Sequence, residues 1–187
     1  MGKYRNTLIK IHVVVAAFFL PVGLMFAITG GLYTIGIKGA VESTKHDIAL
    51  TEPLAGEMGA LVAVAEKELA RLDLSSPSGS ASVRNPGPGG ELEWTGVNRD
   101  ISLRRTSDPL VAQLEVKNAS FHRRFVQLHK AKGSALAKTI SVAWGIGLIV
   151  LLGTGMVIAC AVPTHRKLTL GTSIAGLVTF FLYAFIG

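Results

Sequence analysis

The residues of this chain with the most distinctive chemistry are its five histidines, and two of them border long apolar stretches. His12 follows Lys10 at the start of LIKIHVVVAAFFLPVGLMFAITGGLYTIG, and His165 lies in the polar link PTHRK. An imidazole beside hydrocarbon either forms a polar boundary or has a functional role. A b-type haem takes two axial ligands from opposite sides, and histidines on antiparallel helices can supply them. His12 and His165 are therefore candidate haem ligands, with an interfacial role as the alternative for each.

The other three histidines lie in the connection between the apolar stretches. His46, in TKHD, is expected in a solvated loop. His122 and His129 are seven residues apart in FHRRFVQLHK, so in a helix they would share a face but be too far apart to bind one metal. Cys160 is the only cysteine, which excludes an intramolecular disulfide and a C-x-x-C haem-attachment motif. The sequence also contains no glycine-rich phosphate loop and no H-E-x-x-H motif.

Three apolar runs must position these histidines. Of the 187 residues, 49% are hydrophobic, and the mean hydropathy is +0.46. Asp, Glu, Lys and Arg are absent from residues 11–37, 139–165 and 168–187. A helix rises about 1.5 Å per residue and needs about 20 residues to cross the hydrocarbon core. The sequence therefore predicts three transmembrane helices, the first an uncleaved anchor because a signal-peptide core is only about 7–15 residues long.

The charges predict an orientation in the membrane. Three basic residues and no acid precede the first helix, which places the N-terminus in the cytoplasm. All 12 acidic residues lie between Glu42 and Glu115, in the connection that would then be extracytoplasmic. The basic stretch 117–138 runs against this assignment, but long domains cross the membrane largely regardless of charge.

Lysines and arginines at the membrane boundaries account for most of the basic charge. Lipid phosphates or an anionic ligand, and not nucleic acid, are therefore the expected partners of the basic stretch.

The connection between the first two helices predicts a small α+β module. An apolar stripe over 51–72 indicates a helix with Thr51 as its N-cap. The stretch 75–90 is rich in Gly, Pro and Ser and predicts a loop around a short strand. Apolar residues alternate with polar ones at 91–94, 101–104 and 112–116, which predicts antiparallel strands. The expected domains are residues 1–38 (cytoplasmic start and first transmembrane helix), 39–133 (extracytoplasmic module and basic helix) and 134–187 (second and third transmembrane helices with a short cytoplasmic turn).

The first two apolar runs contain two similar short sequences, which form an internal echo. GLMFAITGGLY begins at Gly23 and GLIVLLGTGMV begins at Gly147, and each contains Gly-Leu followed by Thr-Gly. Small residues let helix backbones approach closely. We therefore interpret the echo as helix packing, and we expect the face shared by Gly147 and Gly155 to contact another helix.

Several of these features together resemble the PepSY-associated transmembrane family. They are IH at the start of an apolar helix that ends in TGGLY, the α+β insert, and LHKAKGSALAK before a second helix with Thr-Gly. Members are bacterial inner-membrane proteins, and some are haem-containing reductases that release iron from siderophores at the periplasmic face. The resemblance implies a periplasmic PepSY-like module, haem b as a cofactor, and His129 as a further candidate ligand because it matches the family's LH. Larger members have four or more helices, whereas three are predicted here.

Two functions remain open at this point. In the first, haem b held by His12, His129 and His165 carries electrons across the bacterial inner membrane toward periplasmic ferric chelates, as in a ferric-siderophore reductase. In the second, the chain is an accessory subunit of a larger respiratory or transport complex and has no cofactor of its own. Both predict the lipid bilayer as a partner and assembly into a homo-oligomer or a larger membrane complex.

Overall fold

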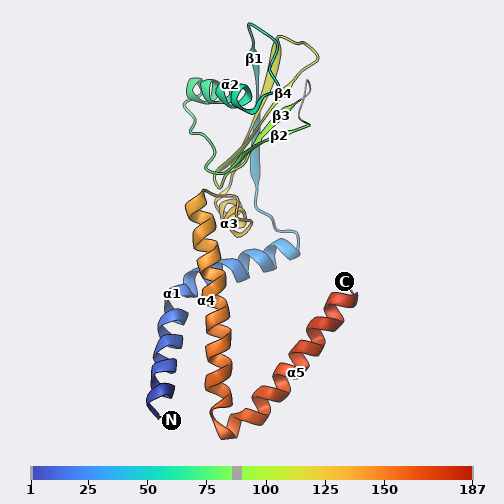
Figure 1. The fold of residues 1–187 in the computed structure, drawn as a ribbon. Coiled ribbons are helices and arrows are strands. Elements are labelled where there is room, and N and C mark those ends of the chain that lie inside the picture. The colour runs from blue at the N-terminus through green and yellow to red at the C-terminus, as the bar shows by residue number, and fades with distance from the viewer. Residues whose placement is uncertain (1, 86–89, 187) are drawn as a thin grey trace. The chain divides into compact units, whose positions relative to one another are not determined.

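A computed structural model describes residues 2–85 and 90–186 (Figure 1). Met1, residues 86–89 and Gly187 lie outside the described residues, so part of the predicted loop 75–90 and the last residue of the third apolar run are not described. The chain divides into two compact units, one of residues 1–23 and 142–187 and the other of residues 24–141.

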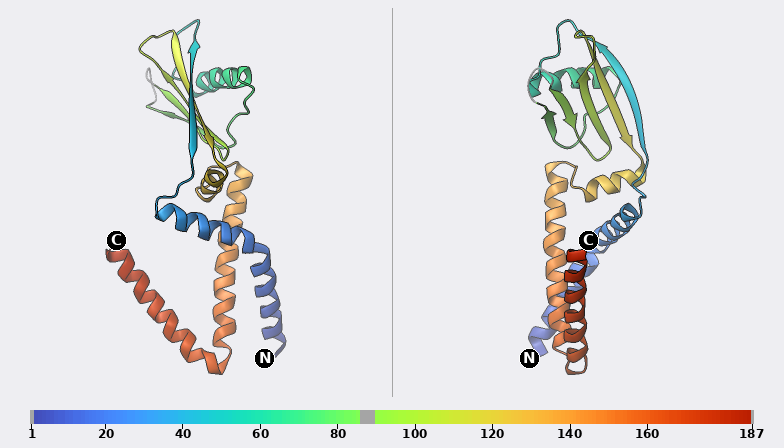
Figure 2. Two further views of the ribbon diagram at one scale, coloured as in Figure 1. Left: turned by 180° about the vertical axis from the view of Figure 1, so that it is seen from behind. Right: turned by 90° about the vertical axis from the view of Figure 1, so that its right-hand side faces the viewer.

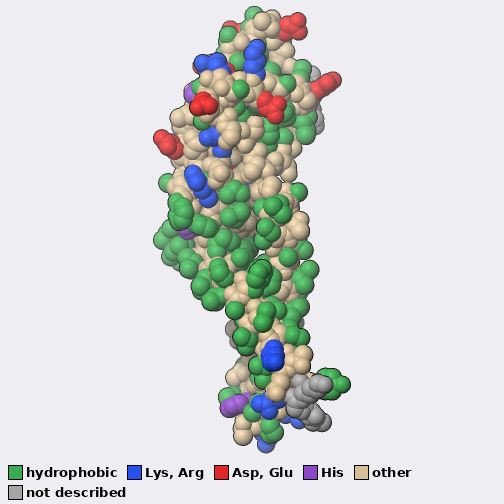
Figure 3. All heavy atoms as spheres, turned by 90° about the vertical axis from the view of Figure 1, so that its left-hand side faces the viewer, with side chains coloured by type: hydrophobic (Ala, Val, Ile, Leu, Met, Phe, Trp, Pro, Cys, Tyr) green, Lys and Arg blue, Asp and Glu red, His purple; other side chains and the backbone are tan. Residues whose placement is uncertain are grey.

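Three helices in the described part of the chain are long and apolar enough to cross a membrane, as the sequence predicts. They are α1 (Gly2–Thr34), α4 (Ala135–Cys160) and α5 (Pro163–Ile186). Large apolar side chains are exposed along all three, and Figure 3 shows extensive hydrophobic surface on the face that it presents. Soluble monomers rarely expose apolar patches of this extent. The helices therefore indicate a membrane protein.

The second unit contains a five-stranded antiparallel sheet in the order β1-β5-β4-β3-β2, with helix α2 (Met58–Arg71) packed against one face (Figure 2). The strands are β1 (Val41–Ala49), β2 (Ala81–Arg84), β3 (Glu91–Trp94), β4 (Arg99–Arg105) and β5 (Val111–Ala119). A small antiparallel sheet with one long helix agrees with the predicted α+β module.

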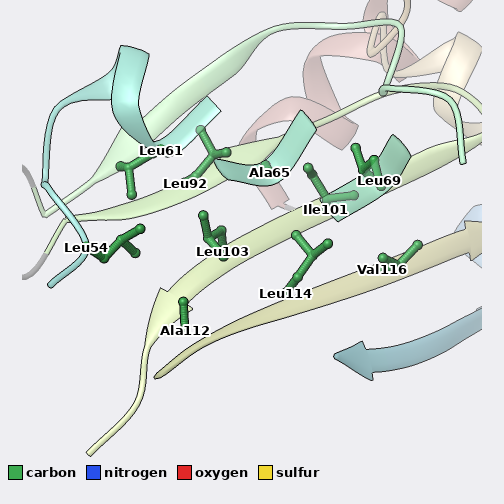
Figure 4. Close-up of a cluster of buried hydrophobic side chains, with 10 residues drawn as sticks. All are labelled: Leu54, Leu61, Ala65, Leu69, Leu92, Ile101, Leu103, Ala112, Leu114 and Val116. Atoms are coloured by element: carbon green, nitrogen blue, oxygen red, sulfur yellow. The ribbon is translucent and has the colours of Figure 1, made fainter. Parts of the chain in front are cut away.

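The core of this module follows from the alternation in the sequence (Figure 4). Leu92 pairs with Leu103 and Leu103 pairs with Leu114, so three leucines form a row across β3, β4 and β5. Side chains at every second position point to one face of a sheet, and all three leucines are fully buried. Leu61, Ala65 and Leu69 of α2 are spaced four residues apart and cover this row.

Two local predictions were wrong. His46, expected in a solvated loop, lies in β1 and is paired with Leu114 of β5. Most side chains of β1 are exposed, so the strand is held by backbone pairing and has no apolar alternation to predict it. Helix α2 begins at Met58, with Glu57 in extended conformation as its N-cap, and not after Thr51.

The buried carboxylate of Glu68 on α2 makes the stability of the module pH-dependent. Arg71 donates Nε–H and Nη2–H to the two carboxylate oxygens at 2.9 and 2.6 Å, and this hydrogen bonding lowers the pKa of Glu68. A carboxylate whose pKa is lowered in the folded state stabilises that state above its unfolded pKa of about 4.3. This stabilisation is lost as the pH falls through the lowered pKa.

We expect Arg71→Met to lower the melting temperature of the module most at neutral pH. The difference from the native chain should narrow below about pH 4.3, where Glu68 becomes protonated in the unfolded chain. The fluorescence of Trp94, measured in a Trp144→Phe background, reports the transition, because Trp94 donates Nε1–H to the carbonyl oxygen of Gly79 within the module. A difference that stays constant from pH 7 to pH 3 would contradict this account.

Candidate functional site: two histidine–threonine contacts

His12 of α1 contacts Thr154 of α4 within the first unit. Its Nδ1 lies 2.9 Å from Thr154 Oγ1. The threonine hydroxyl donates its proton to the carbonyl oxygen of Val150, one turn earlier, at 2.7 Å. Because a hydroxyl has only one proton, Oγ1 accepts the hydrogen bond from the imidazole. Thr154 thus assigns the proton of a neutral His12 to Nδ1.

His129 makes the same kind of contact within the second unit. It ends helix α3 (Phe121–His129), and its Nδ1 lies 2.9 Å from Oγ1 of Thr29 on α1. Thr29 is buried and donates its own proton to the carbonyl oxygen of Met25 at 2.6 Å. The proton of a neutral His129 is therefore also assigned to Nδ1, and Phe26 packs against the imidazole with 4.4 Å between the ring centroids.

A glycine follows each threonine and lets the imidazole approach the helix. A Cβ atom added to Gly155 would lie 3.3 Å from Cε1 of His12, and one added to Gly30 would lie 3.2 Å from Cε1 of His129. The Thr-Gly pairs of the internal echo are thus the two places where a histidine from another helix packs. The sequence shows both the echo and the histidines, but it does not show which of them meet. His12 and Thr154 are 142 positions apart in the chain, and His129 and Thr29 are 100 positions apart.

Each imidazole keeps a second nitrogen available for chemistry. Within residues 2–85 and 90–186, no hydrogen bond involves Nε2 of His12 or Nε2 of His129. With the proton on Nδ1, Nε2 carries an unshared electron pair. A histidine that binds a metal typically donates its other ring N–H to a neighbouring acceptor, which fixes the tautomer. Both histidines have this arrangement.

The surroundings of the two histidines differ in size. His12 lines an open, mostly apolar groove of about 550 Å³. Its other lining residues come from α4 and α5 and are Leu148, Leu151, Leu152, Gly155, Met156, Ala159 and Thr169. His129 lines a smaller apolar cavity of about 240 Å³ with Thr29, Gly30, Tyr33, Val126 and Lys130. Ligand pockets typically measure about 300–1,000 Å³. The cavity at His129 is smaller than this, whereas the space at His12 is a wider groove that is open on one side.

The structure does not bring the other candidate residues to these contacts. His165, near the start of α5, is exposed, and no hydrogen bond between the described residues joins its side chain to His12. Nε2 of His122 lies 3.3 Å from the carbonyl oxygen of Ile37. Cys160 contacts Met156, with 3.8 Å between the sulfur atoms. Among the described residues, no group of three or more His, Cys, Asp or Glu side chains could hold a metal ion.

Comparison with known proteins returned no similarity: no family model, no curated protein and no solved structure matches this chain.

Proposed function

We propose that the chain is a PepSY-type protein of the bacterial inner membrane that carries electrons through a haem b bound at His12. One observation carries this proposal. Thr154 holds the His12 imidazole with its proton on Nδ1, so Nε2 is left as the ligand atom, on the wall of an apolar groove of about 550 Å³. Haem b, when bound, supplies one-electron redox chemistry.

The residues around His12 fit one side of such a group. The leucines of α4 give the groove an apolar wall, and Gly155 leaves room beside the imidazole. His12 is the histidine that lines this groove among the described residues, and His165 is not part of its lining, so one chain would offer one histidine here. We propose that His12 of a second copy supplies the other ligand, which agrees with the expected homo-oligomer. The cavity at His129 is too small for a haem, so His129 serves there to tie α3 to α1.

Electrons from this site would pass outward to a ferric chelate in the periplasm through carriers of a larger complex. The basic stretch 117–138 supports this direction, because cationic surfaces raise the rate of encounter with anionic complexes. The proposed orientation places the N-terminus and the α4–α5 turn in the cytoplasm, and the sheet module in the periplasm.

Cysteine labelling tests the orientation. In a Cys160→Ala background, Asn98→Cys in the module should react with a membrane-impermeant thiol reagent in intact cells. Thr164→Cys, in the turn before α5, should react only after the membrane is opened. Both positions are exposed in the structure, so accessibility within the protein does not limit either reaction. The opposite pattern would place the module in the cytoplasm and contradict the proposed direction of electron transfer.

A second function is favoured by the contact at His129. The same histidine–threonine–glycine arrangement occurs there beside a cavity below the usual size of a ligand pocket, so the arrangement also works as a purely structural tie between helices. If His12 has the same structural role, the chain is an accessory subunit without a cofactor of its own.

The absorption spectrum of the purified chain separates the two functions. Protein from haem-replete cells, extracted in mild detergent, should show the α and Soret bands of a reduced b-type haem after dithionite is added. A colourless preparation would overturn the electron-transfer proposal and leave the accessory role.

A further inference from the structure

Tyr33, near the end of α1, has two lysines over its ring. Nζ of Lys38 lies 5.2 Å from the ring centroid, and Nζ of Lys130 lies 5.7 Å from it. The two ammonium groups are therefore within about 11 Å of each other, close to the Debye length of about 8–10 Å at physiological salt. Arg123 adds a third positive charge, since its Nη1 donates to the carbonyl oxygen of Lys38 at 3.1 Å.

No carboxylate neutralises this group of cations in the described part of the chain. The ion pairs found there are Arg71–Glu68, Arg84–Glu93, Lys117–Glu115 and Lys132–Asp100. Attraction to an aromatic ring leaves the positive charge of both ammonium groups in place. The cluster of Tyr33, Lys38, Arg123 and Lys130 therefore suits an anion.

The place of the cluster along the chain indicates what carries that anion. Tyr33 is the penultimate residue of the apolar span Tyr4–Thr34, and Lys38 lies five residues after Tyr33. Aromatic residues and lysines at such a boundary lie at the level of the lipid headgroups. The cavity lined by Tyr33 and Lys130 is mostly apolar and extends to Thr29, and Ile35, Ile37 and Phe121 expose further apolar surface. A cationic rim beside apolar walls matches a molecule with an anionic head and a hydrocarbon chain.

We propose that this cluster binds the headgroup of an anionic phospholipid, with Lys38 and Lys130 as its cationic groups. Native mass spectrometry of the full chain tests this, with phosphatidylglycerol and phosphatidylcholine as probes added in equal amounts to the detergent micelles. The native chain should retain phosphatidylglycerol in preference to phosphatidylcholine. Each lysine near an anionic lipid contributes about 1 kcal/mol, so Lys38→Gln with Lys130→Gln should weaken retention about ten- to thirtyfold.

A matched control removes the same charge elsewhere. Lys45→Gln with Lys67→Gln changes two exposed lysines of the sheet module and should leave lipid retention unchanged. Equal retention by the native chain and the Lys38–Lys130 double variant would overturn the proposal. Displacement of the lipid by millimolar inorganic phosphate or by an anionic ferric chelate would also overturn it, because the cluster would then be a site for a soluble anion.

Discussion

His12→Gln is expected to remove the b-type haem bands from the purified protein, and His129→Gln is expected to leave them in place. Both variants replace an imidazole that accepts no further hydrogen bond at Nε2 among the described residues and that donates to a threonine at 2.9 Å. The two sites differ in the space beside the imidazole, about 550 Å³ at His12 and about 240 Å³ at His129. An amide cannot hold haem iron as imidazole does, so only the variant at the larger site should lose the haem.

Two further variants distinguish the proposed ligand His12 from the residues around it. Thr154→Val removes the acceptor for Nδ1–H but keeps the imidazole, and loss of such a partner weakens metal binding about 10–100-fold. His165→Gln should change nothing, because the proposed second ligand comes from another copy of the chain. The haem-to-protein ratio from the pyridine haemochrome spectrum measures each outcome. Equal loss of haem in His12→Gln and His129→Gln would contradict the assignment to His12.

The sequence predicted the elements whose apolar residues have a clear period. Leu92, Leu103 and Leu114 alternate with polar neighbours, and they form the central row of the sheet core. The three membrane helices followed from the length of the apolar runs. Strand β1 could not be predicted in this way, since its polar side chains are exposed and its pairing depends on the backbone of β5.

The sequence identified residues of the candidate site but not the contacts between them. His12 stood out because imidazoles are rare in apolar surroundings, His129 because it matches the LH of the PepSY-associated family, and the Thr-Gly echo because it is repeated. Nothing in the sequence joins His12 to Thr154 or His129 to Thr29, because each pair comes from two helices far apart in the chain. The interpretation of the echo as packing is correct for Gly30, Gly147 and Gly155, whereas Gly31 and Gly153 meet nothing within 4 Å. Each threonine also binds a histidine. The unequal spaces beside the two imidazoles depend on the neighbouring side chains and could not be predicted.

The contact between α1 and α4 should depend on one face of α4. A Cβ atom added to Gly147 would lie 2.5 Å from Cε2 of Phe19, whereas one added to Gly145 would meet nothing within 4 Å. Gly155, eight residues after Gly147, faces His12, which confirms that the face shared by these two glycines touches another helix. Gly147→Leu must displace the ring of Phe19, and overpacking of this kind typically costs about 1–3 kcal/mol.

We therefore expect Gly147→Leu to lower the amount of protein in the membrane several-fold, and Gly145→Leu to leave it close to the native level. The two variants add the same apolar side chain to the same helix two residues apart, so hydropathy and helix propensity are matched and only the contact with α1 differs. Quantitative immunoblotting of membrane fractions measures the amount. In the double variant Gly147→Leu with Phe19→Ala, removal of the ring makes room for the leucine and should restore accumulation. If Gly145→Leu reduces the protein as much as Gly147→Leu does, or if Phe19→Ala restores nothing, the face of Gly147 does not pack against α1.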